Sequence, residues 1–367
     1  MKRNPVNLIG QTMLISILVI IVALSACTST KSNYISIDVK DVDYQDKSSL
    51  LIEGTPIDLG IIGVRNITVY DSLLMLETMD PDGMVKVFST NTLKQLGNLC
   101  TRGRAGNEFG YAFTLCGQIY RSGTDILFPL TNNPSGELKT VNISESLRSG
   151  VTTIANTSSI FLSGEYIMLD NDPGNRFEYH VQELMEMGGT TMPVSYSVNK
   201  GGQSQELQVF PELMKSQDDF DVLPPYDGAL AKHPTKNIVI QVMKHMDYIL
   251  FFDFENNKQF AIHQDGTLTY DDVYPQDGNG NTFADIAVAD DYFFVLYWNG
   301  KYSNSQDKSD RKPELLMFDW KGRFLKSAKL GANVSHIEFD STHKQLFGLN
   351  RQTESLYLFD LTTLLNQ

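Results

Sequence analysis

One short pattern recurs along most of the 367-residue chain and limits the folds open to it. In each copy an alternating strand, a turn of a few residues and a second apolar strand follow one another, as runs of β-branched and aromatic residues bounded by Gly, Asn, Asp and Ser predict. The clearest copy has strands at 67–70 and 73–77 around Asp71 and Ser72. Further turns fall near positions 122, 163, 235, 290 and 342, so the spacing averages about 54 residues.

Two more strands follow the hairpin in the clear copies, at 84–88 and 93–97 in the first and at 314–319 and 324–328 in the fifth. Four antiparallel strands at this period are typical of β-propeller blades, and both faces of a blade are buried against its neighbours. We therefore predict an all-β fold, a single six-bladed β-propeller over residues 51–367 with four antiparallel strands in each blade.

The two ends of the repeat array predict how the ring closes. After residues 355–360 too little chain remains for a fourth strand in the sixth blade, whereas the N-terminus has a surplus strand at 56–60 or, alternatively, at 34–38. Pairing an N-terminal strand with the last blade would close the ring and remove an exposed edge. The uneven spacing around the third turn predicts an irregular insertion at about residues 176–227.

Composition narrows the possible partners. Apolar residues make up 41% of the chain, which excludes a wholly disordered protein. The chain carries 30 basic and 44 acidic residues, a net charge of −14, and it has no basic run. Because nucleic-acid binding needs clustered Lys and Arg, we expect no nucleic-acid partner.

The first 27 residues have the order of an export signal. Basic residues at positions 2 and 3 precede an apolar stretch at 13–24, which ends in Leu24-Ser25-Ala26-Cys27. This ending resembles the bacterial lipobox, which implies a signal peptide over residues 1–26 and diacylglycerol on Cys27, followed by a tether over 27–50. The alternative is a transmembrane anchor, but it needs about 20 mostly apolar residues, a length reached only by including three polar ones.

Lipidation would attach the protein to a membrane through acyl chains, since several chains anchor firmly where one is marginal. Removal of residues 1–26 would leave a net charge of −16, which disfavours adsorption to anionic lipid. Thr28 is not the Asp that retains many lipoproteins at the inner membrane, and the tether lacks the acidic run of surface-exported ones. These features predict an outer-membrane lipoprotein that faces the periplasm, with the cell surface as the alternative.

Two other cysteines, Cys100 and Cys116, lie 16 residues apart. In an oxidising compartment they could form a disulfide that contributes roughly 3 kcal/mol by closing the loop. The alternative is two buried thiols that act as small apolar side chains.

A Gly-rich loop at 101–110 is the most distinctive local motif. Its segment from Gly103 to Phe109 resembles the Gly-Arg-Gly-Pro-Gly-Glu-Phe loop of TolB-like six-bladed propeller lipoproteins of Bacteroidetes, and also the blade-junction loop of NHL repeats. Ala105 and Asn107 depart from that motif. The resemblance extends over about residues 50–367 and implies the same fold and a lipid-anchored form.

This loop has a structural and a functional interpretation. Its glycines permit a sharp turn between blades, with Arg102, Arg104 and Glu108 paired at the surface. Alternatively, the two arginines and the glycines form a loop that binds an anion. It is not a P-loop, because no Gly-Lys-Ser/Thr follows.

The sequence contains no nucleophile elbow, and its six histidines are scattered, so we assign neither catalytic residues nor a cofactor. Our hypothesis is a non-enzymatic binding or scaffold propeller that engages a protein or glycan through one face, with carbohydrate capture beside a polysaccharide-uptake system as a weaker version. The alternative is a metal-dependent hydrolase or lactonase with a divalent ion in the central channel. Candidate ligands for that ion are Glu53, Asn66, Asn237, Asp285 and His336.

The lipobox generates the first prediction. Replacing Cys27 by Ala removes the acylated thiol, so the full-length protein should lose its diacylglycerol and should no longer be processed as a lipoprotein. Mass spectrometry of the N-terminal peptide measures this directly. Cys100→Ala is the control and should leave the lipid in place; an unmodified wild-type Cys27 would contradict the prediction.

Overall fold

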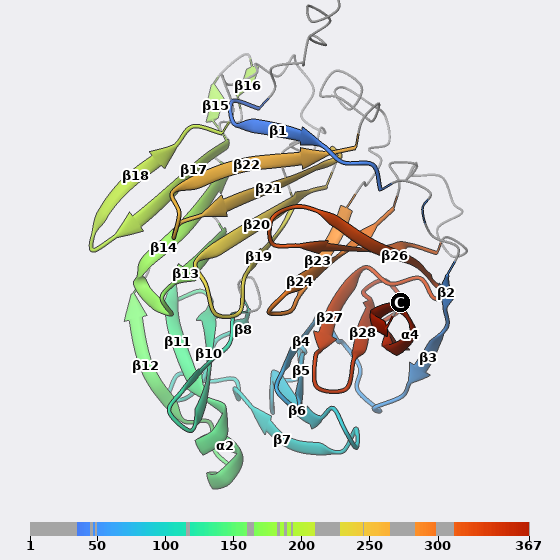
Figure 1. The fold of residues 1–367 in the computed structure, drawn as a ribbon. Coiled ribbons are helices and arrows are strands. Elements are labelled where there is room, and N and C mark those ends of the chain that lie inside the picture. The colour runs from blue at the N-terminus through green and yellow to red at the C-terminus, as the bar shows by residue number, and fades with distance from the viewer. Residues whose placement is uncertain are drawn as a thin grey trace, which may run out of the picture.

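A computed structural model shows the protein as a ring of six sheets (Figure 1). The described residues are 35–44, 47, 50–114, 118–159, 165–181, 184–186, 189–191, 194–209, 228–244, 246–264, 283–298 and 312–366. The predicted signal peptide, Cys27 and the beginning of the predicted tether lie outside the described residues. The predicted all-β, six-bladed propeller is confirmed.

The first three blades follow one another along the chain. Blade 1 contains β4 (Asn66–Tyr70), β5 (Leu73–Glu77), β6 (Val85–Ser89) and β7 (Gln95–Leu99). Blade 2 contains β8 (Ala112–Phe113), β9 (Tyr120–Ser122), β10 (Asp125–Asn132), β11 (Glu137–Asn142) and β12 (Ile154–Ser159). Blade 3 contains β13 (Glu165–Leu169), β14 (Asp172–Val181), β17 (Val194–Lys200) and β18 (Gln203–Leu207), with the small hairpin β15 (Leu184–Glu186) and β16 (Gly189–Thr191) between its middle strands.

The last three blades each take a strand from the N-terminal segment. Blade 4 contains β19 (Gly228–Lys232), β20 (Ile238–Met243), β21 (Tyr248–Asp253) and β22 (Lys258–His263). Blade 5 contains β23 (Phe283–Val288), β24 (Tyr292–Tyr297), β25 (Glu314–Asp319) and β26 (Phe324–Leu330). Blade 6 contains β27 (His336–Asp340), β28 (Gln345–Asn350) and β29 (Ser355–Asp360).

The N-terminal strands cross the outer edges of these blades. β1 (Asp38–Asp41) pairs in parallel with β22, and β2 (Leu51–Ile52) pairs in parallel with β26. β3 (Gly54–Ile57) then pairs antiparallel with β29 as the fourth strand of blade 6. The ring is therefore closed by an N-terminal strand near the first of the two predicted positions. β1 overlaps the other predicted position but serves blade 4.

We call residues 35–57 the strap, because they touch four consecutive blades. The strap begins on blade 3, where the backbone N–H of Ser36 donates to the carbonyl of Val209 at 2.7 Å. Ile35 is buried in the cluster that joins blades 3 and 4. Part of the stretch expected to act as a tether is thus bound to the propeller.

Tyr44 fastens the strap at the seam between blades 4 and 5. Its ring is fully buried and lies edge-on to Tyr297 and Phe318, with centroids 5.8 and 5.5 Å away. Its hydroxyl donates to Asp247, and its backbone N–H donates to Gln264 Oε1 at 2.7 Å. One residue of the strap therefore joins an aromatic cluster to buried polar partners.

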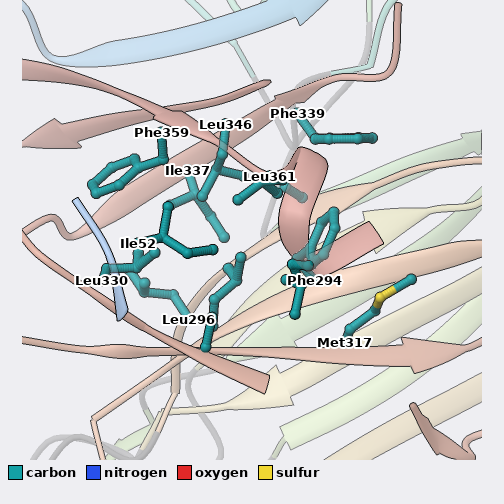
Figure 2. Close-up of a cluster of buried hydrophobic side chains, with 14 of the residues drawn as sticks. Ile52, Phe294, Leu296, Met317, Leu330, Ile337, Phe339, Leu346, Phe359 and Leu361 are labelled. Carbon is teal, nitrogen blue, oxygen red and sulfur yellow. The ribbon is translucent and has the colours of Figure 1, made fainter. Parts of the chain in front are cut away.

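The core lies between neighbouring blades, where apolar side chains of facing sheets interdigitate. Figure 2 shows the seam between blades 5 and 6, in which Phe294 and Leu296 of β24 meet Ile337 and Leu346 of blade 6. Ile52 of the strap packs into the same cluster. Burial on both faces explains the almost continuous apolar character of strands such as β20.

The third repeat differs from the sequence-based placement. We expected its first hairpin turn at Ser163 and Gly164, but the turn between β13 and β14 contains Asp170 and Asn171, both with positive φ. β12, which ends at Ser159, is the outer strand of blade 2. Strand-turn-strand patterns look alike wherever they occur in a blade, so the local sequence did not identify the innermost hairpin.

Helices are few. α2 (Ile143–Ser149) lies against β10, with Asn142 as N-cap and Gly150 in a left-handed C-cap, and α4 (Thr362–Asn366) follows the last strand. Within the described residues, none of the helices has the length and hydropathy needed to cross a membrane.

The strap yields the second prediction. Tyr44→Ala removes a fully buried ring and its hydroxyl contact, so we expect the free energy of unfolding to fall by about 3–5 kcal/mol. Urea unfolding followed by tryptophan fluorescence measures it. Leu325→Ala, at a side chain 39% exposed on β26, is the control and should change stability by less than about 0.5 kcal/mol. An equally small effect of Tyr44→Ala would show that the strap does not stabilise the ring.

Candidate functional site

The innermost strands of the blades surround a central channel. β19 lies beside β23, β23 beside β27, and β27 beside β4, so these first strands form much of its wall. The channel contains a cavity of about 900 Å³ lined by residues from all six blades. A concave cavity of this size with a mixed polar and apolar wall is a candidate ligand site.

His336 joins three blades at this wall. Its Nδ1 faces the carboxylate of Asp285 on β23, and its Nε2 lies 3.1 Å from the carbonyl of Ile67 on β4. Each ring nitrogen of His336 therefore lies within reach of an oxygen atom of a neighbouring blade. Asp285 also accepts from the backbone N–H of Ile337 at 2.7 Å. These contacts of His336 and Asp285 link blades 5, 6 and 1.

Glu77 performs a similar function between blades 1 and 2. Its buried carboxylate accepts from the backbone N–H of Thr114 at 3.0 Å, from the Thr114 hydroxyl, and from Asn66 Nδ2 at 3.2 Å. Asn66 in turn accepts from Arg351 Nη2 of blade 6 at 3.0 Å. Burial raises the pKa of Glu77, while its hydrogen-bond donors act in the opposite direction.

Other polar links join the remaining seams. Gln118 exchanges two hydrogen bonds with the backbone of Met168, of 2.6 and 3.0 Å, and so connects blades 2 and 3. The Tyr196 hydroxyl bonds to Gln241 between blades 3 and 4. Much of the polar wall thus serves ring assembly.

Glu338 differs from Asp285 and Glu77, whose carboxylates link neighbouring blades. It lies two residues after His336 on β27 and is partly buried in the cavity wall. Burial raises its pKa well above the usual range, and the nearby charges of Asp285 and Glu77 raise it further, although the backbone N–H of Val69 donates to it. Burial therefore favours the protonated, neutral form of this carboxyl group more than in an exposed glutamate.

Of the five candidate metal ligands, Asn66, Asp285 and His336 line the channel, but Glu53 and Asn237 do not. Glu53 follows β2 at the rim and packs against Gly331, and Asn237 donates to Asp170 at 2.6 Å. No group of three His, Cys, Asp or Glu side chains in the described part of the chain has metal-binding geometry. The donors that do converge are occupied by blade-to-blade hydrogen bonds, so this set does not fit a catalytic metal.

The loop at 101–110 lies away from the channel lining, at the junction of blades 1 and 2. Glu108 folds back inside the loop, where its Oε2 accepts from the N–H of Ala105 at 2.8 Å and occupies the space that a Cβ on Gly103 would need. Arg102 and Arg104 are exposed, and among the described residues neither forms an ion pair. Glu108 therefore stabilises the turn itself, whereas the expected pairing of Glu108 with the two arginines is not found among the described residues, and anion binding by the loop stays a prediction.

Lys139 of blade 2 holds that loop in place. Its ammonium donates to the carbonyls of Gly106 and Glu108, at 3.2 and 2.7 Å, and lies over the ring of the buried Phe109. Cys100, just before the loop, is fully buried, and burial raises the pKa of its thiol. Cys116 lies outside the described residues, so the disulfide stays a prediction.

Two residues of the cavity wall, Glu338 and Lys232, and the nearby Glu77 were missed by the sequence-based search. Glu77 ends the otherwise apolar strand β5, Glu338 alternates with apolar residues on β27, and Lys232 ends β19 before a turn. The only available signal was a charged residue within or at the end of an inner strand. Charges at strand ends are so common on surfaces that the sequence did not distinguish them.

Comparisons with known proteins support the fold. No protein-family model and no curated protein matches the chain. Among solved structures, a member of the DUF4221 family from Bacteroides vulgatus superposes with a TM-score of 0.51 at 9% identity, over 90% of this chain and 98% of that one. A presumed exported protein from Bacteroides fragilis matches 88% of this chain and 98% of its own, also at 9% identity, with a TM-score of 0.46. At these identities only the first likeness is informative, and it concerns the fold alone.

The raised pKa of Glu338 generates the third prediction. The folded protein binds this proton more tightly than the unfolded chain, so the free energy of unfolding falls as pH rises above the ordinary value of 4.5. Glu338→Gln keeps the group neutral at every pH, so the variant should lose less stability than wild type between about pH 5 and 8. Urea unfolding across that range measures this.

Glu77 also has a raised pKa, so the variant should retain part of the pH dependence. The control is Glu206→Gln, at an exposed position on β18, which should follow the wild-type curve. Identical pH dependence in wild type and Glu338→Gln would contradict a raised pKa of Glu338.

Proposed function

We propose that this protein is a lipid-anchored, extracytoplasmic binding propeller without catalytic activity, which engages a glycan or protein at one mouth of its channel. The proposal is supported most by how the channel acids are used. Glu77 and Asp285 each accept several hydrogen bonds from neighbouring blades, and His336 uses both ring nitrogens. Groups engaged in this way build the cavity wall, and proton transfer or metal binding would require them to give up these hydrogen bonds.

Rigidity suits a binding module. Each polar link spans two blades, so the inner strands cannot shift independently and the cavity keeps its shape without a ligand. A preformed site loses little conformational entropy on binding. The turns at its mouth, such as that between β27 and β28, are exposed and can vary without disturbing the ring.

The proposed membrane attachment and cellular location are inferred from the N-terminal sequence. The lipobox ending at Cys27 supports an acylated protein in the outer membrane that faces the periplasm. The loop at 103–109 and the six-bladed ring support a relationship with TolB-like and NHL-like propeller lipoproteins. The strap would then connect the acyl anchor directly to blades 3–6.

A glycan is the ligand that the mouth favours. Tyr70 and Tyr120 line the cavity close to the first turns of blades 1 and 2, and burial raises the pKa of both hydroxyls, which keeps them neutral. Such rings offer apolar faces and hydrogen-bonding edges. Asn171 and Thr235 add amide and hydroxyl groups to the same wall.

The fourth prediction tests which face binds. Ser341 is exposed in the β27–β28 turn and lines the mouth, so Ser341→Trp should obstruct it. Gln352→Trp is the matched control in the β28–β29 turn, which lies at the other end of these strands and is exposed. We would titrate fluorescent neutral, amino and acidic oligosaccharides into the full chain in detergent and measure anisotropy.

The expected result is saturable binding of at least one saccharide that Ser341→Trp weakens by about tenfold or more and Gln352→Trp leaves within about twofold. Lactone and ester hydrolysis would be measured in parallel, with and without added divalent ions. Metal-dependent turnover would contradict the proposal and favour the hydrolase alternative.

A further inference from the structure

Residues of both charges line the channel, although the chain as a whole has a net charge of −14. At the mouth built by the first turns of the blades, Asp71 is paired with Arg121, and each cancels the other. Lys232 lies at the same mouth without such an ion pair. A ligand could therefore supply the anion that pairs with its ammonium.

Lys232 is the last residue of β19, partly buried, and part of the cavity wall. Asp170 and Glu255 are the acids that act on its charge. Both are engaged by Asn237, whose side chain donates to Asp170 at 2.6 Å and whose backbone N–H donates to Glu255 at 3.3 Å. In the described part of the chain, no carboxylate lies within ion-pairing distance of the Lys232 ammonium.

Burial lowers the pKa of Lys232 even though these two acids oppose the change. The loss of hydration therefore destabilises the ammonium more than the two neighbouring acids stabilise it. An anion that reaches the Lys232 ammonium would stabilise it. The ammonium was already desolvated when the protein folded, so this part of the cost does not arise again on binding.

The residues near this lysine indicate which kind of anion fits. Tyr70, Tyr120 and Asn171 stand within three residues of the first turns of blades 1, 2 and 3, as Lys232 does in blade 4. All four line the same cavity. The blade topology therefore places aromatic rings, an amide and an ammonium around one opening.

We propose that this mouth binds an acidic saccharide, with the sugar carboxylate paired to Lys232 and the ring against the tyrosines. The inference rests on the proposed function and narrows its ligand to uronate-type sugars. A bare inorganic anion would leave the aromatic and amide groups unused. A neutral sugar would leave the ammonium without a partner.

The test is calorimetric titration of the full chain in detergent with trigalacturonate and with the neutral galactotriose. Lys232→Met removes the charge but retains the length of the side chain. Lys236→Met is the matched control, at an exposed lysine in the same turn that is not part of the cavity wall. A charge-assisted hydrogen bond contributes about 10- to 100-fold in affinity, which sets the expected loss.

We expect trigalacturonate to bind wild type and Lys236→Met alike, and Lys232→Met at least about tenfold more weakly. Galactotriose should bind wild type at least about tenfold more weakly than the acidic trimer, and added salt should reduce the difference. No detectable uronate binding, or equal binding by Lys232→Met, would overturn the inference. Binding of neutral sugars that Ser341→Trp blocks but Lys232→Met does not would overturn it while leaving the proposed function intact.

Thermal unfolding separates loss of the site from loss of the fold. The unliganded Lys232→Met variant should melt no lower than wild type, because it no longer buries an unpaired ammonium. Trigalacturonate should raise the melting temperature of wild type and Lys236→Met but not of Lys232→Met. A ligand-induced shift of wild-type size in Lys232→Met would contradict a direct contact.

Discussion

The pairing of β3 with β29 is the contact on which the rest of the molecule depends. A propeller blade is apolar on both faces, so it is stable only between two neighbours, and an open ring would expose two such faces. The short last blade obtains its outer strand from residues 54–57. Closure then brings Phe347 and Leu349 of blade 6 against Ile67 and Leu76 of blade 1 in one buried cluster.

The strap extends that closure over most of the ring. It adds parallel edge strands to blades 4 and 5 before it completes blade 6, and Tyr44 anchors it between aromatic and polar partners. In a protein anchored by Cys27, this segment would also transmit the attachment to the membrane. Anchoring and ring closure would then depend on the same residues, and a load on the anchor would be spread across several blades.

The polar groups in and beside the channel differ in how fully the ring engages them. Glu77, Asp285 and His336 look like a catalytic cluster when they are considered only by residue type, yet their hydrogen bonds connect neighbouring blades. Lys232 and Glu338 are less fully engaged, and both have pKa values shifted toward the neutral form by burial. Side chains that the ring does not use for its own assembly are therefore the better guide to a ligand.

The sequence by itself determined the number of blades, the hairpins and the need for an N-terminal closing strand, because strand alternation and turn residues act over a few neighbouring positions. It did not determine which hairpin of the third repeat was innermost, since β12 followed by β13 has the same local pattern as a blade hairpin. Only the tertiary structure brought Asp285 to His336 and Glu77 to Thr114. Those contacts depend on the order and packing of whole blades around the channel, and no local interaction encodes them.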